Sequence, residues 1–165
     1  MSAQTRYYYN NPIGAAGGLV DLSPVEIDTF SNEEENAKMK FGMGVVRGTD
    51  AGKQIKLPVA ASTASVFEGI VTNNRTRERD LDGELFIRKN SAVGVLRYGK
   101  IYARLAEGVT PAYGDNVYLV KSGDDAGCFT NTAGETAVQV KGRFIGAKDT
   151  VTGVAPVELF NEAQA

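Results

Sequence analysis

Short apolar runs with a two-residue period dominate the chain from residue 41 onward. In the clearest run, Val138, Val140, Gly142 and Phe144 alternate with Gln139, Lys141 and Arg143. Comparable runs lie at 44–47, 54–57, 66–71, 85–89, 93–97, 101–105, 117–120 and 156–160. Alternation of this kind marks strands with one buried face. Turn-forming pairs such as Asp82-Gly83 and Tyr98-Gly99 separate the runs. The pattern predicts a mainly β fold, either a small β-barrel or a jelly-roll-like sandwich.

The first part of the chain has a different composition from the rest. Residues 1–35 hold one base and six acids, and they include the glycine- and alanine-rich stretch from Gly14 to Gly18. Such a stretch is typical of a flexible chain. We therefore predict an extended N-terminal arm over residues 1–40, with a short helix from Asn32 to Lys40, and a β-rich body over residues 41–165. Thirty-five extended residues would span roughly 115 Å, so the arm could contact neighbouring subunits.

The residue types that are missing exclude most kinds of catalysis. The sequence of 165 residues contains no histidine, and Cys128 is its only cysteine. Serine–histidine and cysteine–histidine catalysis and most transition-metal sites are thereby excluded. We expect no catalytic residues, no metal site and no cofactor, and we interpret Cys128 as a packing residue. A chain with one cysteine is typical of synthesis in a reducing cytosol.

The overall charge and hydropathy argue against two classes of partner. The net charge is -2, so no basic field is available to bind nucleic acid. No apolar run reaches the 18 residues that a membrane-spanning helix needs. The N-terminal residues also lack the basic and apolar regions of a secretory signal. We expect neither nucleic acid nor a membrane as partner.

Three consecutive tyrosines form the first candidate for a partner-binding site. Tyr7, Tyr8 and Tyr9 lie in the predicted arm and are followed by Pro12 and Ile13. Large amphipathic side chains on a polar, glycine-rich segment are typical of anchors in protein interfaces. The alternative is that the segment folds back and covers the chain's own barrel.

The densest charged stretch, from Asn74 to Asp80, forms the second candidate. In an extended conformation Arg75, Arg77 and Arg79 share one face, which could bind an acidic surface through bidentate hydrogen bonds. The alternative is an exposed loop whose arginines pair with the neighbouring acids Glu78 and Asp80.

Several segments of the body resemble a known protein family. These are FGMGVVRGTDAGKQIKLPVAASTASVFEGIV from Phe41, VGVLRYGKIYARLAEGVTPAYGDNVYLV from Val93, AVQVKGRFIGA from Ala137 and VAPVELF from Val154. In order and spacing they are similar to the structural cement, or capsid decoration, proteins of tailed bacteriophages. The resemblance covers roughly residues 41 to 160 and carries no catalytic signature.

The resemblance implies a non-enzymatic protein on the outer surface of an icosahedral phage head. Its partners would be the major capsid protein and further copies of itself, with trimers favoured and dimers possible. By binding across capsid subunit boundaries, such a protein would stabilise the expanded shell. Two alternatives remain open from the residues alone. One is another virion component, such as a neck, tail or head-fibre base protein. The other is a surface-displayed module that binds glycans or a receptor.

Overall fold

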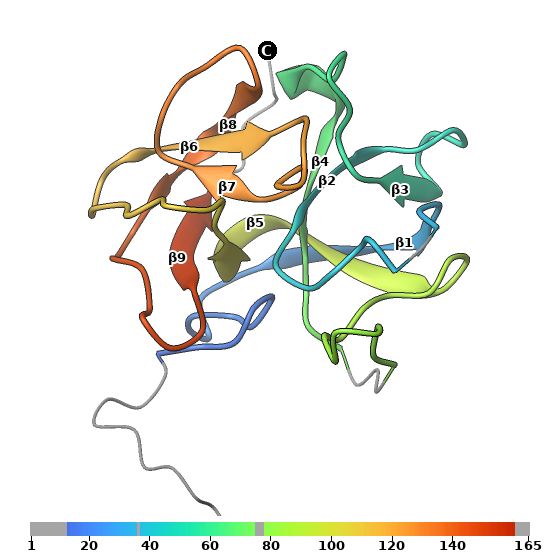
Figure 1. Ribbon diagram of the computed structural model, residues 1–165, viewed down its shortest axis with the longest axis horizontal. Coiled ribbons are helices and arrows are strands. Elements are labelled where there is room, and N and C mark those ends of the chain that lie inside the picture. Colours follow the sequence, from blue (N-terminus) through green and yellow to red (C-terminus); the bar gives the residue numbers. More distant parts are fainter. Residues whose placement is uncertain (1–12, 36, 75–77, 161–165) are drawn as a thin grey trace, which may run out of the picture.

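The structure, a computed structural model, describes residues 13–35, 37–74 and 78–160, and within them the chain is almost entirely β (Figure 1). The strands are β1 (Glu26–Asn32), β2 (Gly44–Arg47), β3 (Gln54–Lys56), β4 (Phe67–Val71), β5 (Ala92–Arg104), β6 (Asn116–Val120), β7 (Phe129–Thr130), β8 (Ala137–Phe144) and β9 (Val154–Leu159). The only helical element among these residues is a single 3-10 turn at Ala64–Val66. The predicted mainly β class is confirmed.

Five strands close into a small barrel. They follow the order β1, β3, β2, β4 and β5, and the antiparallel pairing of β1 with β5 joins the two ends. The pairing of β1 with β3 is parallel, and the other pairings in the ring are antiparallel. Closure removes the exposed strand edges that would otherwise pair with other chains. The sequence-based prediction of a small barrel is therefore confirmed.

The long strand β5 belongs to both halves of the molecule (Figure 1). Its first half pairs with β1, and the residues from Gly99 to Arg104 pair with β9 instead. Gly99 adopts a φ of 122° at the change of partner, and a Cβ there would lie 2.7 Å from Cγ1 of Val25. The predicted turn at Tyr98-Gly99 is wrong, because the glycine bends a continuous strand instead of ending it.

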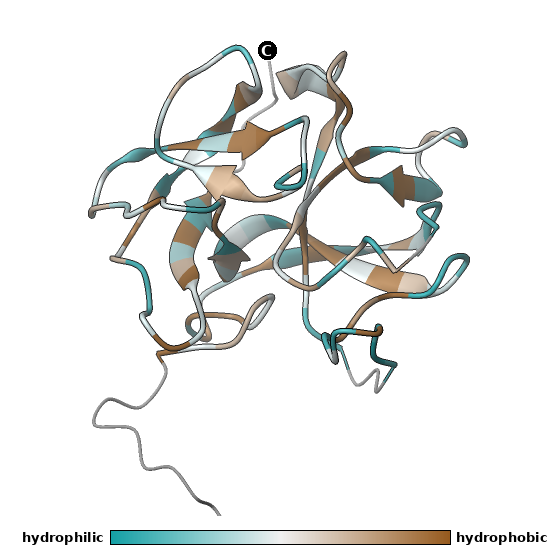
Figure 2. Cartoon of the chain, in the orientation of Figure 1, coloured by the Kyte–Doolittle hydropathy of each residue, from teal (hydrophilic) through white to brown (hydrophobic). Residues whose placement is uncertain are grey.

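Strands β9, β8, β6 and β7 extend the sheet from β5 and fold over the barrel. A parallel bridge between Leu105 and Phe129 brings β7 back to the chain just after β5. Two cores result. One fills the barrel interior and the other lies between the barrel wall and the added strands. Val45, Val71 and Val95 belong to the first core, whereas their neighbours Val46, Ile70 and Leu96 belong to the second. Strands β2, β4 and β5 therefore place apolar side chains on both faces at these positions. In Figure 2, hydrophobic residues, coloured brown, recur along the strands.

The packed body begins well before residue 41. Strand β1 is part of the barrel, and both Phe30 and Met39 are buried in the interior core. Two acids conceal the strand in the sequence, because Glu26 and Asp28 share the parity of the buried Phe30 and Asn32. Whether residues 1–12 form an extended arm stays a prediction, because they lie outside the described residues.

The helix predicted from Asn32 to Lys40 is wrong, since none of the described residues in this stretch is helical. The fully buried side chain of Asn32 donates to the carbonyl of Ile87 at 2.9 Å and accepts from the amide of Glu34 at 2.8 Å. Glu34 in turn accepts from the amide of Leu57 at 3.1 Å. Side chains that bond backbone groups in this way compete with helix formation.

Candidate functional site

A strap of residues 14–20 fastens the N-terminal part of the described chain onto β5. The amide of Gly17 donates to the carbonyl of Tyr102 at 2.8 Å, and the amide of Tyr102 donates to the carbonyl of Gly18 at 2.9 Å. The amide of Val20 donates to the carbonyl of Lys100 at 3.1 Å. The strap thereby acts as a short extra strand on the side of β5 that faces away from β9.

Close packing explains the glycines of the strap. Gly17 is buried with a φ of 74°, and a Cβ on it would lie 2.7 Å from the amide nitrogen of Asn73 and 2.8 Å from the carbonyl oxygen of Val71. The amide of Asn73 donates to the carbonyl of Gly17 at 2.8 Å, so the contact is bonded as well as tight. The flexible chain predicted for Gly14–Gly18 is therefore wrong. Here glycine permits two backbones to approach.

Ionic contacts hold the segment that follows the strap. Nζ of Lys100 lies 2.8 Å from a carboxylate oxygen of Asp21 and 3.4 Å from the hydroxyl of Ser23. The lysine, together with the hydroxyl and amide of Ser23, lowers the pKa of Asp21 from its ordinary 3.8 to about 2. The carboxylate therefore stays charged, and the contact to Lys100 persists, across the neutral and mildly acidic range.

Ile13 marks the point at which the described chain begins beside the strap. Its side chain is 64% exposed, and its amide donates a short hydrogen bond to the carboxylate of Asp149. The same buried carboxylate accepts the amides of Val151 and Thr152. The bond from the Ile13 amide, followed by these two, lowers the pKa of Asp149. Of the predicted binding residues, Tyr7, Tyr8, Tyr9 and Pro12 lie outside the described residues. Ile13 is described and does expose its side chain.

Arg79, from the predicted arginine face, points into its own loop. Its guanidinium donates to the carbonyl of Gly83, and its backbone bridges to Leu85. Arg75 and Arg77 lie outside the described residues, so a shared arginine face stays a prediction. The alternative was that these arginines pair with Glu78 and Asp80. In the structure both acids pair with bases outside the arginine stretch, Asp80 with Lys40 at 3.0 Å and Glu78 with Arg88 at 3.0 Å.

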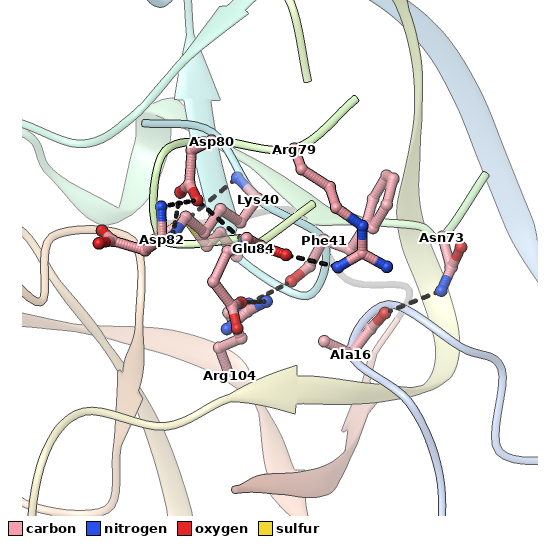
Figure 3. Close-up of polar contacts among 11 residues, drawn as sticks. Ala16, Lys40, Phe41, Asn73, Arg79, Asp80, Asp82, Glu84 and Arg104 are labelled. Atoms are coloured by element: carbon pink, nitrogen blue, oxygen red, sulfur yellow. Dashed lines mark hydrogen bonds and ion pairs between the residues drawn. The ribbon is translucent and has the colours of Figure 1, made fainter. Parts of the chain in front are cut away.

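Polar contacts hold the loop from Glu78 to Phe86, and Figure 3 shows those of Arg79, Asp80 and Glu84. One carboxylate oxygen of Asp80 accepts the amides of Asp82 and Glu84 at 3.0 and 2.8 Å. The carboxylate of Glu84 lies 3.2 Å from Arg104, whose Nε donates to the carbonyl of Phe41 at 2.8 Å. Figure 3 also shows the bond from Asn73 to Ala16, so strap and loop are anchored in the same region. Strap and loop together form the candidate site of the described chain.

The loop also presents a residue that sequence reasoning missed. Leu81, at the tip, is fully exposed, with a relative accessibility of 106%. The Asp82-Gly83 turn was visible in the sequence, but nothing there separates an exposed leucine from a core one.

The described residues offer little for catalysis. They contain no cluster of three or more His, Cys, Asp or Glu side chains suited to a metal ion. An open groove of ≈ 920 Å³ beside the loop is lined partly by Cys128. Burial raises the pKa of that thiol to about 11, so it is protonated at neutral pH and a poor nucleophile. Among the described residues, no helix is long and apolar enough to cross a bilayer.

Comparison with protein families decides the classification. Residues 3–160 match the sequence model of the structural cement proteins, described as "Structural cement protein (E217 gp24/Pam3 gp6)". The chain belongs to this family of phage structural proteins. The resemblance noted in the body segments is thereby confirmed, and it extends to residues before 41.

A solved structure shares the fold of this cement protein. It is a chain from "The capsid of Myoviridae Phage XM1", with a TM-score of 0.75 and 21% sequence identity. The match covers 98% of this chain and 99% of the other, so the barrel and the added strands are both shared. No curated protein sequence matches the chain. Family membership indicates a structural role as a cement protein of a phage virion.

Proposed function

We propose that this cement protein binds the outside of an icosahedral phage head across capsid subunit boundaries and thereby stabilises the expanded shell. The observation that carries the proposal is the strap, which fixes where residues 1–12 leave the body. Because the strap is hydrogen-bonded to β5, a short segment before it can transmit force to the barrel. A flexible linker in place of the strap would extend first. Twelve residues can span roughly 40 Å when extended. That distance exceeds the radius of a compact domain of this size, so the segment reaches a neighbouring subunit.

The chemistry of residues 1–12 suits such an anchor. Tyr7, Tyr8 and Tyr9, with Pro12 and Ile13, supply apolar area with few rotatable bonds. The exposed side chain of Ile13 continues this apolar character to the edge of the body. A residue that contacts the capsid here pulls directly on the hydrogen bonds between strap and β5.

Many weak contacts made together can stabilise a shell without catalysis. We propose that the protein acts as a homo-oligomer, so each oligomer binds several capsid subunits at once and gains avidity. If its site exists only on the expanded shell, binding favours that state by mass action. No enzyme activity, nucleic acid or membrane is required for this role.

Removal of residues 1–12 tests the proposal. The truncated protein keeps Ile13, the strap and both cores, so we expect an unchanged thermal midpoint. Its affinity for purified expanded shells, measured by co-sedimentation, should fall at least tenfold. A Tyr7→Ser, Tyr8→Ser, Tyr9→Ser variant is the matched control, because it keeps the length of the segment and removes only the aromatic area. Equal binding of the full-length and truncated proteins would remove the anchor from the account. Equal binding of full-length protein to compact and expanded shells would remove the stabilising mechanism.

A further inference from the structure

The loop that carries Leu81 is more rigidly built than its exposed position requires. Besides the two bonds to the carboxylate of Asp80, the amide of Asp80 donates to the carbonyl of Glu84 at 2.8 Å. The amide of Gly83 returns to the carbonyl of Asp80 at 3.1 Å, and the amide of Phe86 donates to the carbonyl of Glu78 at 3.2 Å. Lys40 and Arg104 then tie the loop to the body through ion pairs. The result is a fixed tip with an apolar side chain in water.

A fixed apolar tip is suited to binding because its ordering cost is met in the free protein. Association normally loses free energy when loops and side chains become ordered, and a loop held in place beforehand avoids that loss. Val59, which is 52% exposed, lies on the same groove as Leu81, so the apolar area extends beyond one residue. Contiguous exposed apolar area bordered by polar groups is typical of interaction sites.

The charges around the tip indicate the chemistry of the partner. The loop holds four acids. Asp80 pairs with Lys40, Glu84 with Arg104 and Glu78 with Arg88, whereas Asp82 has no ion pair with any described residue. Arg79, the base of the same loop, is directed to the carbonyl of Gly83. The tip therefore combines a leucine with a carboxylate that has no ion pair among the described residues. A complementary surface is an apolar pocket bordered by a lysine or arginine.

We infer that Leu81 and Asp82 form a second capsid-binding contact, in which Leu81 enters an apolar pocket of the major capsid protein and Asp82 pairs with a basic residue at its rim. This inference rests on the proposed function and adds a contact that does not involve residues 1–12. The strap packs beside the backbone that anchors the loop, because a Cβ on Gly17 would lie 3.1 Å from the amide nitrogen of Gly42, and the adjacent Phe41 accepts from Arg104, the partner of Glu84. Both contacts can therefore engage one shell surface (Figure 3).

Two fully exposed leucines allow a matched test. Leu81 and Leu22 have relative accessibilities of 106% and 102%, so truncation of either one leaves no cavity and should not change folding. The affinity of Leu81→Ala, Leu22→Ala and unmodified protein for purified expanded shells is measured by co-sedimentation. We expect Leu81→Ala to bind at least tenfold more weakly and Leu22→Ala to stay within twofold of the unmodified protein. Asp82→Asn should bind about threefold more weakly and show a smaller loss of affinity when salt is raised.

The outcomes separate the two proposals. If unmodified protein does not bind shells, the proposed function fails. If it binds but Leu81→Ala binds equally well, only this inference is overturned. Equal losses in Leu81→Ala and Leu22→Ala would also overturn it, because they would indicate general adhesion of apolar area and no specific pocket.

Discussion

Substitution of Gly17 by alanine isolates the role of the strap. A Cβ at Gly17 would meet backbone atoms of Asn73 and Val71 at 2.7 and 2.8 Å, and backbone atoms cannot move aside as a side chain can. Gly108 supplies a matched control, because its φ of 73° is close to the 74° of Gly17 and a Cβ there would have no atom within 4 Å. The two variants share the cost of a left-handed backbone, and only one adds a clash.

The magnitudes follow from these two contributions. A non-glycine residue in the left-handed region costs about 1 kcal/mol, which is the whole effect expected for Gly108→Ala. Overpacking costs a further ~2 kcal/mol, so Gly17→Ala should lose about 3 kcal/mol of unfolding free energy. For a chain of this length, each kcal/mol lowers the thermal midpoint by roughly 3 °C. We therefore expect decreases of about 3 °C for Gly108→Ala and about 9 °C for Gly17→Ala.

Two measurements check the reasoning. Thermal and urea unfolding followed by circular dichroism give the stabilities, and hydrogen exchange reports on the amides of Gly17 and Val20. Release of the strap from β5 would relieve part of the strain and appear as faster exchange at these two amides. Equal stability of the two variants together with unchanged exchange would refute the close packing of the strap.

Two further predictions concern pH and a buried amide. Because the folded-state pKa of Asp21 lies near 2, below its ordinary 3.8, its contribution to stability is present above about pH 4 and is lost as the pH falls through 2. Thermal midpoints between pH 7 and 2 should show this loss, and Asp21→Asn should show a smaller one; an acid response of Asp21→Asn equal to that of unmodified protein would contradict the assignment. Asn32→Ala should cost about 2–4 kcal/mol, because it leaves the buried carbonyl of Ile87 and the amide of Glu34 without their partner. Urea unfolding measures this cost, and a loss below 1 kcal/mol would show that water replaces the amide.

Strands that consist of a short apolar run beside a clear turn were predictable from the sequence. The run 44–47 coincides with β2, and 117–120 differs from β6 by one residue at its start. Both predictions succeed because apolar side chains fill the core-facing positions. Strand β1 was not predicted, because its buried face ends in Asn32. A polar side chain can be buried there only because backbone groups distant in sequence form hydrogen bonds with it. The run 85–89 forms no strand, although Ile87 is buried, because it packs as an irregular segment held by the carbonyl of Met39.

The candidate site was less predictable than the fold for a physical reason. Whether Gly14–Gly18 is flexible or closely packed depends on which backbone approaches it, and the chain supplies that backbone from Val71, Asn73 and Tyr102. The charged stretch before Asp80 likewise reads as a binding face in isolation. Lys40 and Arg104, both distant in sequence, convert the following loop into a fixed tip.

The central claim, attachment over the whole phage head, is tested most directly by the copy number of the protein in purified particles. Quantitative peptide mass spectrometry gives its ratio to the major capsid protein. The account predicts near-stoichiometric abundance. A few copies per particle would place the protein in the neck, tail or fibres, and its absence from particles would contradict the account altogether.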